Sequence, residues 1–304
     1  MSEPVLVSGA AGFLGWWLAR ELLRRGHAVH GTSRDGQGLP AGVVPHRLEL
    51  SDGGAQGAAL VRALRPAAVF HLAALSDADA CARDPDLAER VNARAPAALA
   101  GAAEEAGAWF VQASTDLVFD GTRPPYGEDD PPAPLGPYMA TKAAAERAVL
   151  GAAPGALVAR VALLYGLAGG RKGCFSQVLL ERLGRGQPVT LFSDQYRTPL
   201  LVQDGAELLC DLLAARPAGL LHLAGPERVS RWEHGVVLAR AFGLDPAGCV
   251  SGSLAAAVAG GGPAALAPRP PDVSLRTTRL QALVGRAALG VEEGCRRAAR
   301  EGTG

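Results

Sequence analysis

A tyrosine and a lysine four residues apart are the side chains of this 304-residue chain best suited to proton chemistry. Tyr138 and Lys142 stand in the segment Tyr-Met-Ala-Thr-Lys. On a helix this spacing places both on one face, one turn apart. An ammonium beside a phenol favours the phenolate, so we expect Lys142 to lower the pKa of Tyr138. The phenol could then exchange a proton with an oxygen next to a carbon that gains or loses hydride.

Lysine is rare in this chain, which makes its position informative. Lys142 and Lys172 are the two lysines among 30 basic residues, so arginine supplies nearly all the positive charge. We therefore interpret Lys142 as a residue needed as lysine, able to bond ribose hydroxyls of a nucleotide. The alternative is an exposed helical pair without a function.

A second polar stretch begins after an apolar run at 109–113. Ser114, Thr115 and Asp116 would stand at the carboxyl end of a strand, where ligands bind in open parallel sheets. The hydroxyl of Thr115 could hold a substrate oxygen beside the Tyr138 phenol. The alternative is that this hydroxyl only begins a turn.

Three glycines near the N-terminus indicate a phosphate site. Gly9, Gly12 and Gly15 follow an apolar strand and open a helix, in a GxxGxxG spacing. They would allow a tight turn, a close approach of backbone to pyrophosphate, and close packing of helix on strand. The helix N-terminus would offer free N–H groups and partial positive charge. A glycine turn without a ligand is the alternative.

The hydrophobic pattern predicts the elements that position these residues. Strands and helices alternate along the chain, which favours an α/β fold with a doubly wound parallel (Rossmann) sheet and a smaller C-terminal α/β substrate region. We expect strands at 5–7, 28–32, 44–50, 67–72, 109–113 and 157–161, and helices at 14–25, 54–64, 85–107 (bent at Pro96) and 138–150.

We divide the chain into a dinucleotide-binding region with the catalytic residues (1–165) and a smaller substrate-binding region (166–304). Residues 200–225 are expected to return to the sheet. Further helices are expected at 174–183, 204–215 and 231–242, with strands at 188–191 and 220–223. The proline-rich segment 120–137 is predicted to be a functional loop and 251–272 a surface loop.

Composition excludes several classes of function. The 30 basic and 30 acidic residues cancel, which argues against a nucleic-acid or membrane-surface partner. No apolar run approaches a membrane span, and no leader precedes the first strand, so we expect a cytoplasmic protein. The five scattered cysteines are interpreted as reduced thiols, and the six histidines show no metal-ligand spacing. His71, in a buried strand, is expected to be a hydrogen-bonded core residue.

Together these motifs resemble the extended short-chain dehydrogenase/reductase superfamily. Within it, the Ser-Thr-Asp-x-Val-Phe-Asp-Gly run at 114–121 and the proline-rich loop resemble the dTDP-4-dehydrorhamnose reductase family and the related regulatory β subunits of methionine adenosyltransferase. Further matches are Arg160-Val161, the run 194–199 and Arg269-Pro270.

The resemblance implies a catalytic set of Thr115, Tyr138 and Lys142. Tyr138 would be the general acid toward a ketone, with hydride supplied by a nicotinamide. Asn92 matches a helix asparagine that supports a proton relay through water. Its alternative is a kinked helix with a satisfied amide.

The resemblance also implies a cofactor site. NADP(H) is favoured over NAD(H), because Arg34 follows the second strand where an acid would bind the ribose of NAD. An ordinary solvated arginine is the alternative. The expected cofactor residues are Gly9, Ala11, Gly12, Phe13, Leu14, Gly15, Ser33, Arg34, Glu49, Leu50, Leu72, Ala73, Ala74, Tyr138 and Lys142.

A nucleotide-linked sugar is the substrate that the resemblance implies, with Thr115, Asp116 and Tyr138 as substrate-binding residues. Arg197 is a further candidate, for a phosphate or diphosphate of the substrate, and an ordinary surface arginine is its alternative. Leu117 replaces the second acid of sugar-nucleotide dehydratases, which argues against water elimination. A non-catalytic regulatory subunit and an epimerase remain alternatives. The resemblance makes a homodimer possible and implies no metal.

Overall fold

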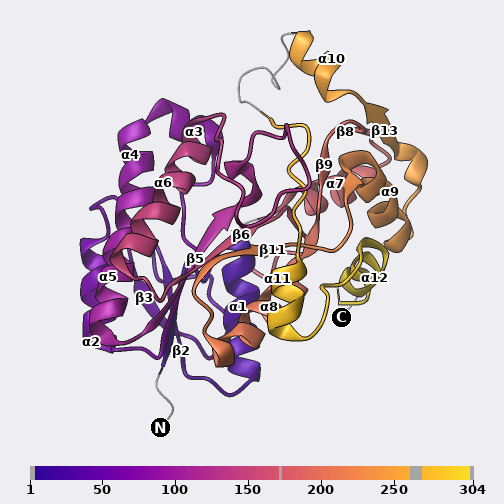
Figure 1. Cartoon of the computed structure of the whole chain (residues 1–304). Coiled ribbons are helices and arrows are strands. Elements are labelled where there is room, and N and C mark those ends of the chain that lie inside the picture. Colours follow the sequence, from indigo (N-terminus) through magenta and orange to yellow (C-terminus); the bar gives the residue numbers. More distant parts are fainter. Residues whose placement is uncertain (1–3, 171–172, 261–268, 302–304) are drawn as a thin grey trace.

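A seven-stranded parallel sheet forms the centre of the molecule (Figure 1). The computed structural model describes residues 4–170, 173–260 and 269–301. The strands run in the order β11-β6-β5-β4-β1-β2-β3, and every pairing is parallel. Their bounds are Val5–Ser8 (β1), Val29–Ser33 (β2), Val44–Arg47 (β3), Ala68–His71 (β4), Trp109–Thr115 (β5), Leu157–Val161 (β6) and Gly219–Leu223 (β11).

Helices cover both faces of this sheet, as its continuous apolar strands require. One face carries α1 (Phe13–Arg24), α8 (Val202–Ala215) and α11 (Thr278–Val284), and the other carries α2 (Ala55–Leu64), α5 (Ala95–Ala106) and α6 (Pro137–Ala152). Each layer closes over its own apolar core, with Leu18 and Leu208 in one and Val61 and Leu99 in the other. The predicted doubly wound α/β fold is confirmed.

A smaller group of helices and short strands lies beside the central sheet and its helices α1 and α8 (Figure 1, right). It has its own core, which includes Leu179, Leu191 and Leu238. Its elements are β7 (Leu164–Tyr165), α7 (Phe175–Gly184), β8 (Val189–Phe192), β9 (Tyr196–Arg197), β10 (Leu200–Leu201), β12 (Val229–Ser230), α9 (Arg231–Ala241), β13 (Cys249–Gly252), α10 (Leu254–Ala259) and α12 (Val291–Glu301). None of the described helices is both long enough and apolar enough to cross a bilayer.

The predicted helix 85–107 is present, because α4 (Pro85–Glu89), a π-helical turn η1 (Arg90–Arg94) and α5 follow one another without a gap, after a short α3 (Ala78–Arg83). The irregular turn precedes Pro96, which sits in the first turn of α5, where proline is tolerated. The predicted loop 251–272 was wrong. This segment contains β13 and α10 in its first part, while 261–268 lie outside the described residues.

Helix α10 forms because its N-terminus is capped twice. The Ser253 hydroxyl accepts from the Ala256 amide, and the Asp194 carboxylate accepts from the amides of Leu254 and Ala255. Asp194 is remote in sequence, so local composition does not reveal this cap.

The glycine turn after β1 has the geometry that its spacing predicts. Gly9 has φ of +81°, a left-handed conformation that favours glycine. The Gly12 amide donates to the Gly9 carbonyl oxygen at 2.9 Å. A Cβ on Gly15 would lie 2.2 Å from that same oxygen. Helix α1 therefore packs on the turn at a distance that only glycine permits.

We expect Gly15→Ala to lower the free energy of unfolding by about 2–3 kcal/mol, because the added methyl overpacks the turn. The measurement is urea-induced unfolding. Gly101→Ala is the matched control, since Gly101 is also inside a helix and a Cβ there meets nothing within 4 Å. The control should gain about 0.5–1 kcal/mol. Equal stability of the two variants would contradict the close packing.

Candidate functional site

A cleft of about 940 Å³ opens beyond the carboxyl ends of β1, β2 and β4. This size is typical of a site for a large organic ligand. Twelve of the expected cofactor residues line the cleft: Gly9, Ala11, Gly12, Phe13, Leu14, Ser33, Arg34, Glu49, Leu50, Leu72, Ala73 and Ala74. The other lining residues are Ser8, Thr32, Asp35, Arg47, Leu48, Leu75, Ser76, Asp77, Leu87 and Val91.

The glycine turn forms the end of the cleft suited to phosphate. Gly12 is the N-cap of α1, and no side chain caps this helix start. The first amides of α1 are therefore available to an anion, which the helix dipole also favours. A Cβ on Gly9 would lie 2.8 Å from the Ala73 amide nitrogen, so the glycine turn packs directly against the segment that follows β4. Gly15 does not line the cleft but packs behind it.

The opposite end of the cleft carries two arginines. Arg34 follows β2, and Arg47 ends β3 directly opposite Ser33 in the parallel register. The nearby acid, Asp35, accepts hydrogen bonds from the Ser33 hydroxyl (3.3 Å) and the Gln37 amide (3.1 Å). This end of the cleft therefore offers the guanidinium groups of Arg34 and Arg47. One carboxylate oxygen of Asp35 already accepts two hydrogen bonds within its turn.

Lys142 and Tyr138 lie on the same face of α6, next to the end of β5, and neither is among the residues lining the cleft. Lys142 is 3% exposed, and its Nζ donates to the Ala113 carbonyl oxygen at 2.6 Å. Burial lowers the pKa of Lys142 to about 8, although the Glu146 carboxylate opposes this shift. The ammonium is thus close to its titration point near neutral pH.

Tyr138 is half-buried, and its phenol lies near the Thr115 hydroxyl. Burial raises the pKa of the phenol, the nearby Asp116 carboxylate and Cys81 thiol raise it further, and the Thr115 hydroxyl acts the other way. The shift is opposite to the lowering by Lys142 that the sequence predicts. Desolvation is the largest cause, and it disfavours the phenolate, so the phenol stays protonated and can donate a proton.

Thr115 also has the role of a turn residue. Its hydroxyl oxygen accepts from the Leu117 amide and its hydroxyl donates to Asp116 Oδ1, both at 3.2 Å. This caps the 3₁₀ turn η2 (Asp116–Val118) at the end of β5. The cap fixes the hydroxyl beside Tyr138, so the structural and the functional interpretation are compatible.

A charged cluster lies next to Tyr138. Asp116 is 4% exposed, its Oδ2 has no hydrogen-bond partner, and Arg197 Nε lies 3.9 Å away. Burial raises the pKa of Asp116, although Arg197 opposes this shift. Burial lowers the pKa of Arg231 to about 10, and the positive charges of Arg197 and Arg269 lower it further. Asp116 therefore links the phenol to a group of three arginines that act on one another.

Besides the other unpredicted residues that line the cleft, the sequence prediction did not include three arginines among the site residues, namely Arg47, Arg231 and Arg269. Arg231 begins α9, where its guanidinium carbon lies 3.9 Å from the centre of the Phe175 ring. It comes near Arg197 because β9 and β12 pair antiparallel. The available signal was weak: Arg269 belongs to a family match, and Arg47 ends a strand next to Arg34.

Asn92 holds the loop that leaves β4. Its Oδ1 accepts from the Leu75 amide at 2.8 Å, while Nδ2 donates to the Leu75 carbonyl (3.0 Å) and to the Thr141 hydroxyl (3.2 Å). The side chain is fully buried within the π-helical turn. These bonds place Asn92 between the cleft wall and helix α6.

His71 differs from its expectation. It is fully buried at the end of β4, but neither ring nitrogen has a hydrogen-bond partner. Burial and the charge of Lys142 together lower its pKa to about 3. It is therefore a neutral, unsatisfied histidine beside the ammonium.

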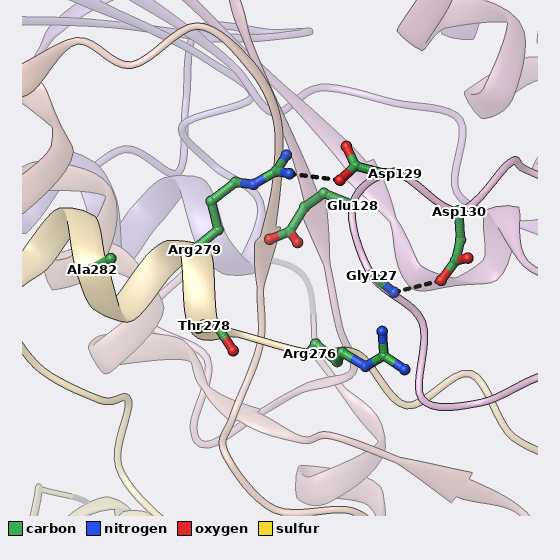
Figure 2. A pocket seen from close by; sticks show the side chains of 8 residues that line it. All are labelled: Gly127, Glu128, Asp129, Asp130, Arg276, Thr278, Arg279 and Ala282. Carbon is green, nitrogen blue, oxygen red and sulfur yellow. Dashed lines mark hydrogen bonds and ion pairs between the residues drawn. The ribbon is translucent and has the colours of Figure 1, made fainter.

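A second hollow of about 430 Å³ lies between the 127–130 turn and α11 (Figure 2). Its acidic groups are already engaged. Asp129 pairs with Arg279 at 2.9 Å, Asp130 accepts from the Gly127 amide, and the Glu128 carboxylate accepts from the His222 amide. We therefore interpret these acidic groups as structural, since the Asp129–Arg279 ion pair links the turn to α11. No described group of three or more His, Cys, Asp or Glu side chains is arranged to hold a metal.

Comparison with known proteins now places the chain. A family model described as the RmlD substrate binding domain matches residues 3–302. The chain belongs to this family.

The proteins similar to this one carry the names of more than one role. The chain is 34% identical to a dTDP-4-dehydrorhamnose reductase of Salmonella typhimurium over 72% of this chain and 71% of that protein. It is 31% identical to methionine adenosyltransferase 2 subunit beta of Danio rerio over 92% and 84%. The crystal structure of dTDP-4-dehydrorhamnose reductase from Bacillus anthracis in complex with NADP superposes with a TM-score of 0.85, at 25% identity, covering 99% of this chain and 100% of that chain. The resemblance drawn from the sequence is confirmed.

We expect Asn92→Ala to lower the free energy of unfolding by about 1–3 kcal/mol, because the part-buried Leu75 amide loses its partner and the Leu75 carbonyl keeps only the Cys81 thiol as a donor. Thr141→Val removes the bond from Asn92 and the bond that the Thr141 hydroxyl donates to the Tyr138 carbonyl, and should cost about 1 kcal/mol. Both values come from urea unfolding curves. A cost below about 0.5 kcal/mol for Asn92→Ala would show that the amide does not hold the loop.

Proposed function

We propose that this RmlD-family protein is an NADP(H)-dependent reductase of a keto group on a nucleotide-linked sugar. The observation that carries the proposal is the grouping of Tyr138, Thr115 and Lys142: a protonated phenol lies near a hydroxyl that the turn holds in place, one helical turn from the buried Lys142. The Salmonella and Bacillus relatives make dTDP-4-dehydrorhamnose the first substrate to test.

The residues present fit a dinucleotide. The uncapped start of α1 and the glycine turn can accept a pyrophosphate, and the cleft continues to β2 and β3. When bound, NADPH supplies the hydride that reaches the carbonyl carbon. Tyr138 gives its proton to the carbonyl oxygen, so that a hydroxyl forms, and Thr115 orients that oxygen. Lys142 stabilises the phenolate that Tyr138 becomes and donates to the ribose.

The charged cluster fits the substrate's phosphates. Arg197, Arg231 and Arg269 would bind a nucleotide diphosphate, which suits planar guanidinium groups. The unpartnered oxygen of Asp116 would accept a sugar hydroxyl. In this proposal, residues 1–165 hold the dinucleotide and the catalytic groups, and 166–304 supply much of the substrate site.

NADP(H) is the proposed cofactor rather than NAD(H). Arg34 and Arg47 face the cleft from adjacent strands, where they would pair with a 2′-phosphate. An NAD site would present a free acid there, whereas Asp35 already accepts two hydrogen bonds within its turn.

A regulatory subunit is the second candidate, because the match to methionine adenosyltransferase 2 subunit beta covers 92% of this chain. The intact set of Thr115, Tyr138 and Lys142 favours an enzyme. A purified protein that binds NADPH, reduces no keto-sugar nucleotide and forms a stable complex with a second enzyme would reverse this preference.

We expect Tyr138→Phe to reduce turnover of dTDP-4-dehydrorhamnose at least about 10³-fold, because no other described group donates its proton. NADPH affinity, measured by fluorescence titration, should change less than about threefold, since Lys142 and the glycine turn remain. The reaction is followed at the NADPH absorbance. Turnover near that of the wild type would disprove the mechanism.

We expect Arg34→Ala and Arg47→Ala each to raise KM for NADPH about 10- to 100-fold, and to leave KM for NADH nearly unchanged. The reason is that only NADPH carries the phosphate they would pair with. Arg83→Ala, an exposed arginine outside the cleft, is the control. Parallel losses for both cofactors would refute the assignment of a 2′-phosphate site.

A further inference from the structure

A buried ion pair lies behind the Tyr138–Lys142 pair and has no part in the steps described above. Arg160 on β6 is 1% exposed, and it donates to Glu146 of α6 from Nε (3.1 Å to Oε1) and Nη2 (2.9 Å to Oε2). The Ser114 hydroxyl on β5 donates to Glu146 Oε1 at 2.6 Å. Both carboxylate oxygens therefore have partners on the sheet.

The position of Glu146 makes this arrangement unusual. Glu146 stands one helical turn after Lys142, a spacing at which a carboxylate and a lysine normally pair. Among the described residues no ion pair joins them. Lys142 instead donates to Ala113, which is the one hydrogen bond of its three N–H groups within the described chain. The carboxylate has been drawn to the sheet and away from the ammonium.

Arg160 is itself held on two further sides. Its Nη1 donates to the Glu128 carbonyl oxygen at 3.2 Å, and its guanidinium lies 4.9 Å from the centre of the Phe119 ring. Glu128 belongs to the turn that Asp129 and Arg279 fasten to α11 (Figure 2). The guanidinium therefore cannot follow Glu146 toward Lys142 without leaving these contacts.

Few charges act on the Lys142 ammonium. Glu146 and Tyr138 face it from its own helix, the neutral His71 from β4, and Arg160 stands behind Glu146 on β6. Asp116 and Cys81 act on the phenol of Tyr138. Burial lowers the pKa of Lys142 to about 8, and Glu146 is the group that raises it again.

We propose that Arg160 and Ser114 are positioning residues that hold the Glu146 carboxylate away from Lys142, so that its charge supports the ammonium from a distance while the ammonium N–H groups stay available to the bound dinucleotide. The inference rests on the proposed function for the identity of that ligand. Its geometric part, the separation of carboxylate and ammonium, stands apart from it.

The arrangement meets two opposing requirements. Without a nearby carboxylate, a lysine this deeply buried would lose its charge at neutral pH. With a direct ion pair, the charge would be secure but the N–H groups would be occupied. Anchoring Glu146 to Arg160 keeps the charge and leaves the donors free. It also explains why lysine, with three donors on a point charge, is retained in a chain rich in arginine.

The scarcity of lysine makes the test direct. The full-length protein, carrying Lys172→Arg and labelled with ¹³C at lysine Cε, has Lys142 as its single labelled side chain. Its carbon shift against pH reports the Lys142 titration without any ligand. NADPH affinity of the same samples is measured by fluorescence titration.

Three variants separate the roles. Glu146→Gln should move the Lys142 titration about one pH unit lower, because the supporting charge is removed. Arg160→Met should move it higher and weaken NADPH binding about tenfold, because the released carboxylate pairs with the ammonium. Ser114→Ala removes one anchor, leaves the buried ion pair, and should shift both readouts in the direction of Arg160→Met by a smaller amount. Arg147→Met, on the exposed side of the same helix, is the matched control and should change neither.

The outcomes divide clearly. An unchanged Lys142 titration in folded Glu146→Gln would overturn the inference, as would unchanged titration and NADPH affinity in folded Arg160→Met. If Arg160→Met does not fold, as judged by circular dichroism, Ser114→Ala decides by the same criterion. A wild-type protein that binds no NADPH would instead defeat the proposed function, while the titration shifts would still judge the placement of Glu146.

Discussion

The burial of one ammonium group is the constraint on which the site depends. Lys142 is 3% exposed, and removing a charge from water is costly unless other groups compensate. The compensation comes from two strands and one helix: the Ala113 carbonyl, the Glu146 carboxylate, and the Arg160 and Ser114 groups that hold that carboxylate. Helix α6 must therefore lie close against β5 and β6, and this position also brings Tyr138 to the end of β5.

The same constraint explains why the pKa of the Tyr138 phenol is raised. A solvated tyrosine next to an ammonium would become more acidic, but Tyr138 shares the low-dielectric surroundings of Lys142 and lies near Asp116. Burial therefore disfavours the phenolate, and the pKa rises. For a reduction this is the useful direction, because the group must arrive protonated and give up its proton only when negative charge develops on the carbonyl oxygen. Lys142 then matters most after that transfer, when it faces a phenolate.

The sequence contained what depends on local spacing. The turn was predicted from the spacing of Gly9, Gly12 and Gly15. The shared helical face was predicted from the spacing of Tyr138 and Lys142, which matches the period of a helix. Most elements of the sheet followed for the same reason. The π-helical turn at 90–94 was not predicted, because Pro96 is a visible signal in the sequence whereas the irregular turn around Asn92 has none. The direction of the Tyr138 pKa shift was wrong because desolvation cannot be counted from spacing.

What the sequence could not provide depends on pairs that are distant along the chain. Arg231 and Arg197 meet through an antiparallel pairing of two-residue strands, too short to leave a pattern. In the sequence, Glu146 has the i+4 spacing of an ion-pair partner for Lys142. In the structure, Ser114 and Arg160 bind its carboxylate instead, because the register of β5 and β6 places them beside it. Ser114 and Arg160 face one another in that register, so one strand pairing fixes the carboxylate, the ammonium and the phenol along a single helix. The chemistry of the site therefore depends on the order and register of the strands as much as on the Tyr138–Lys142 motif.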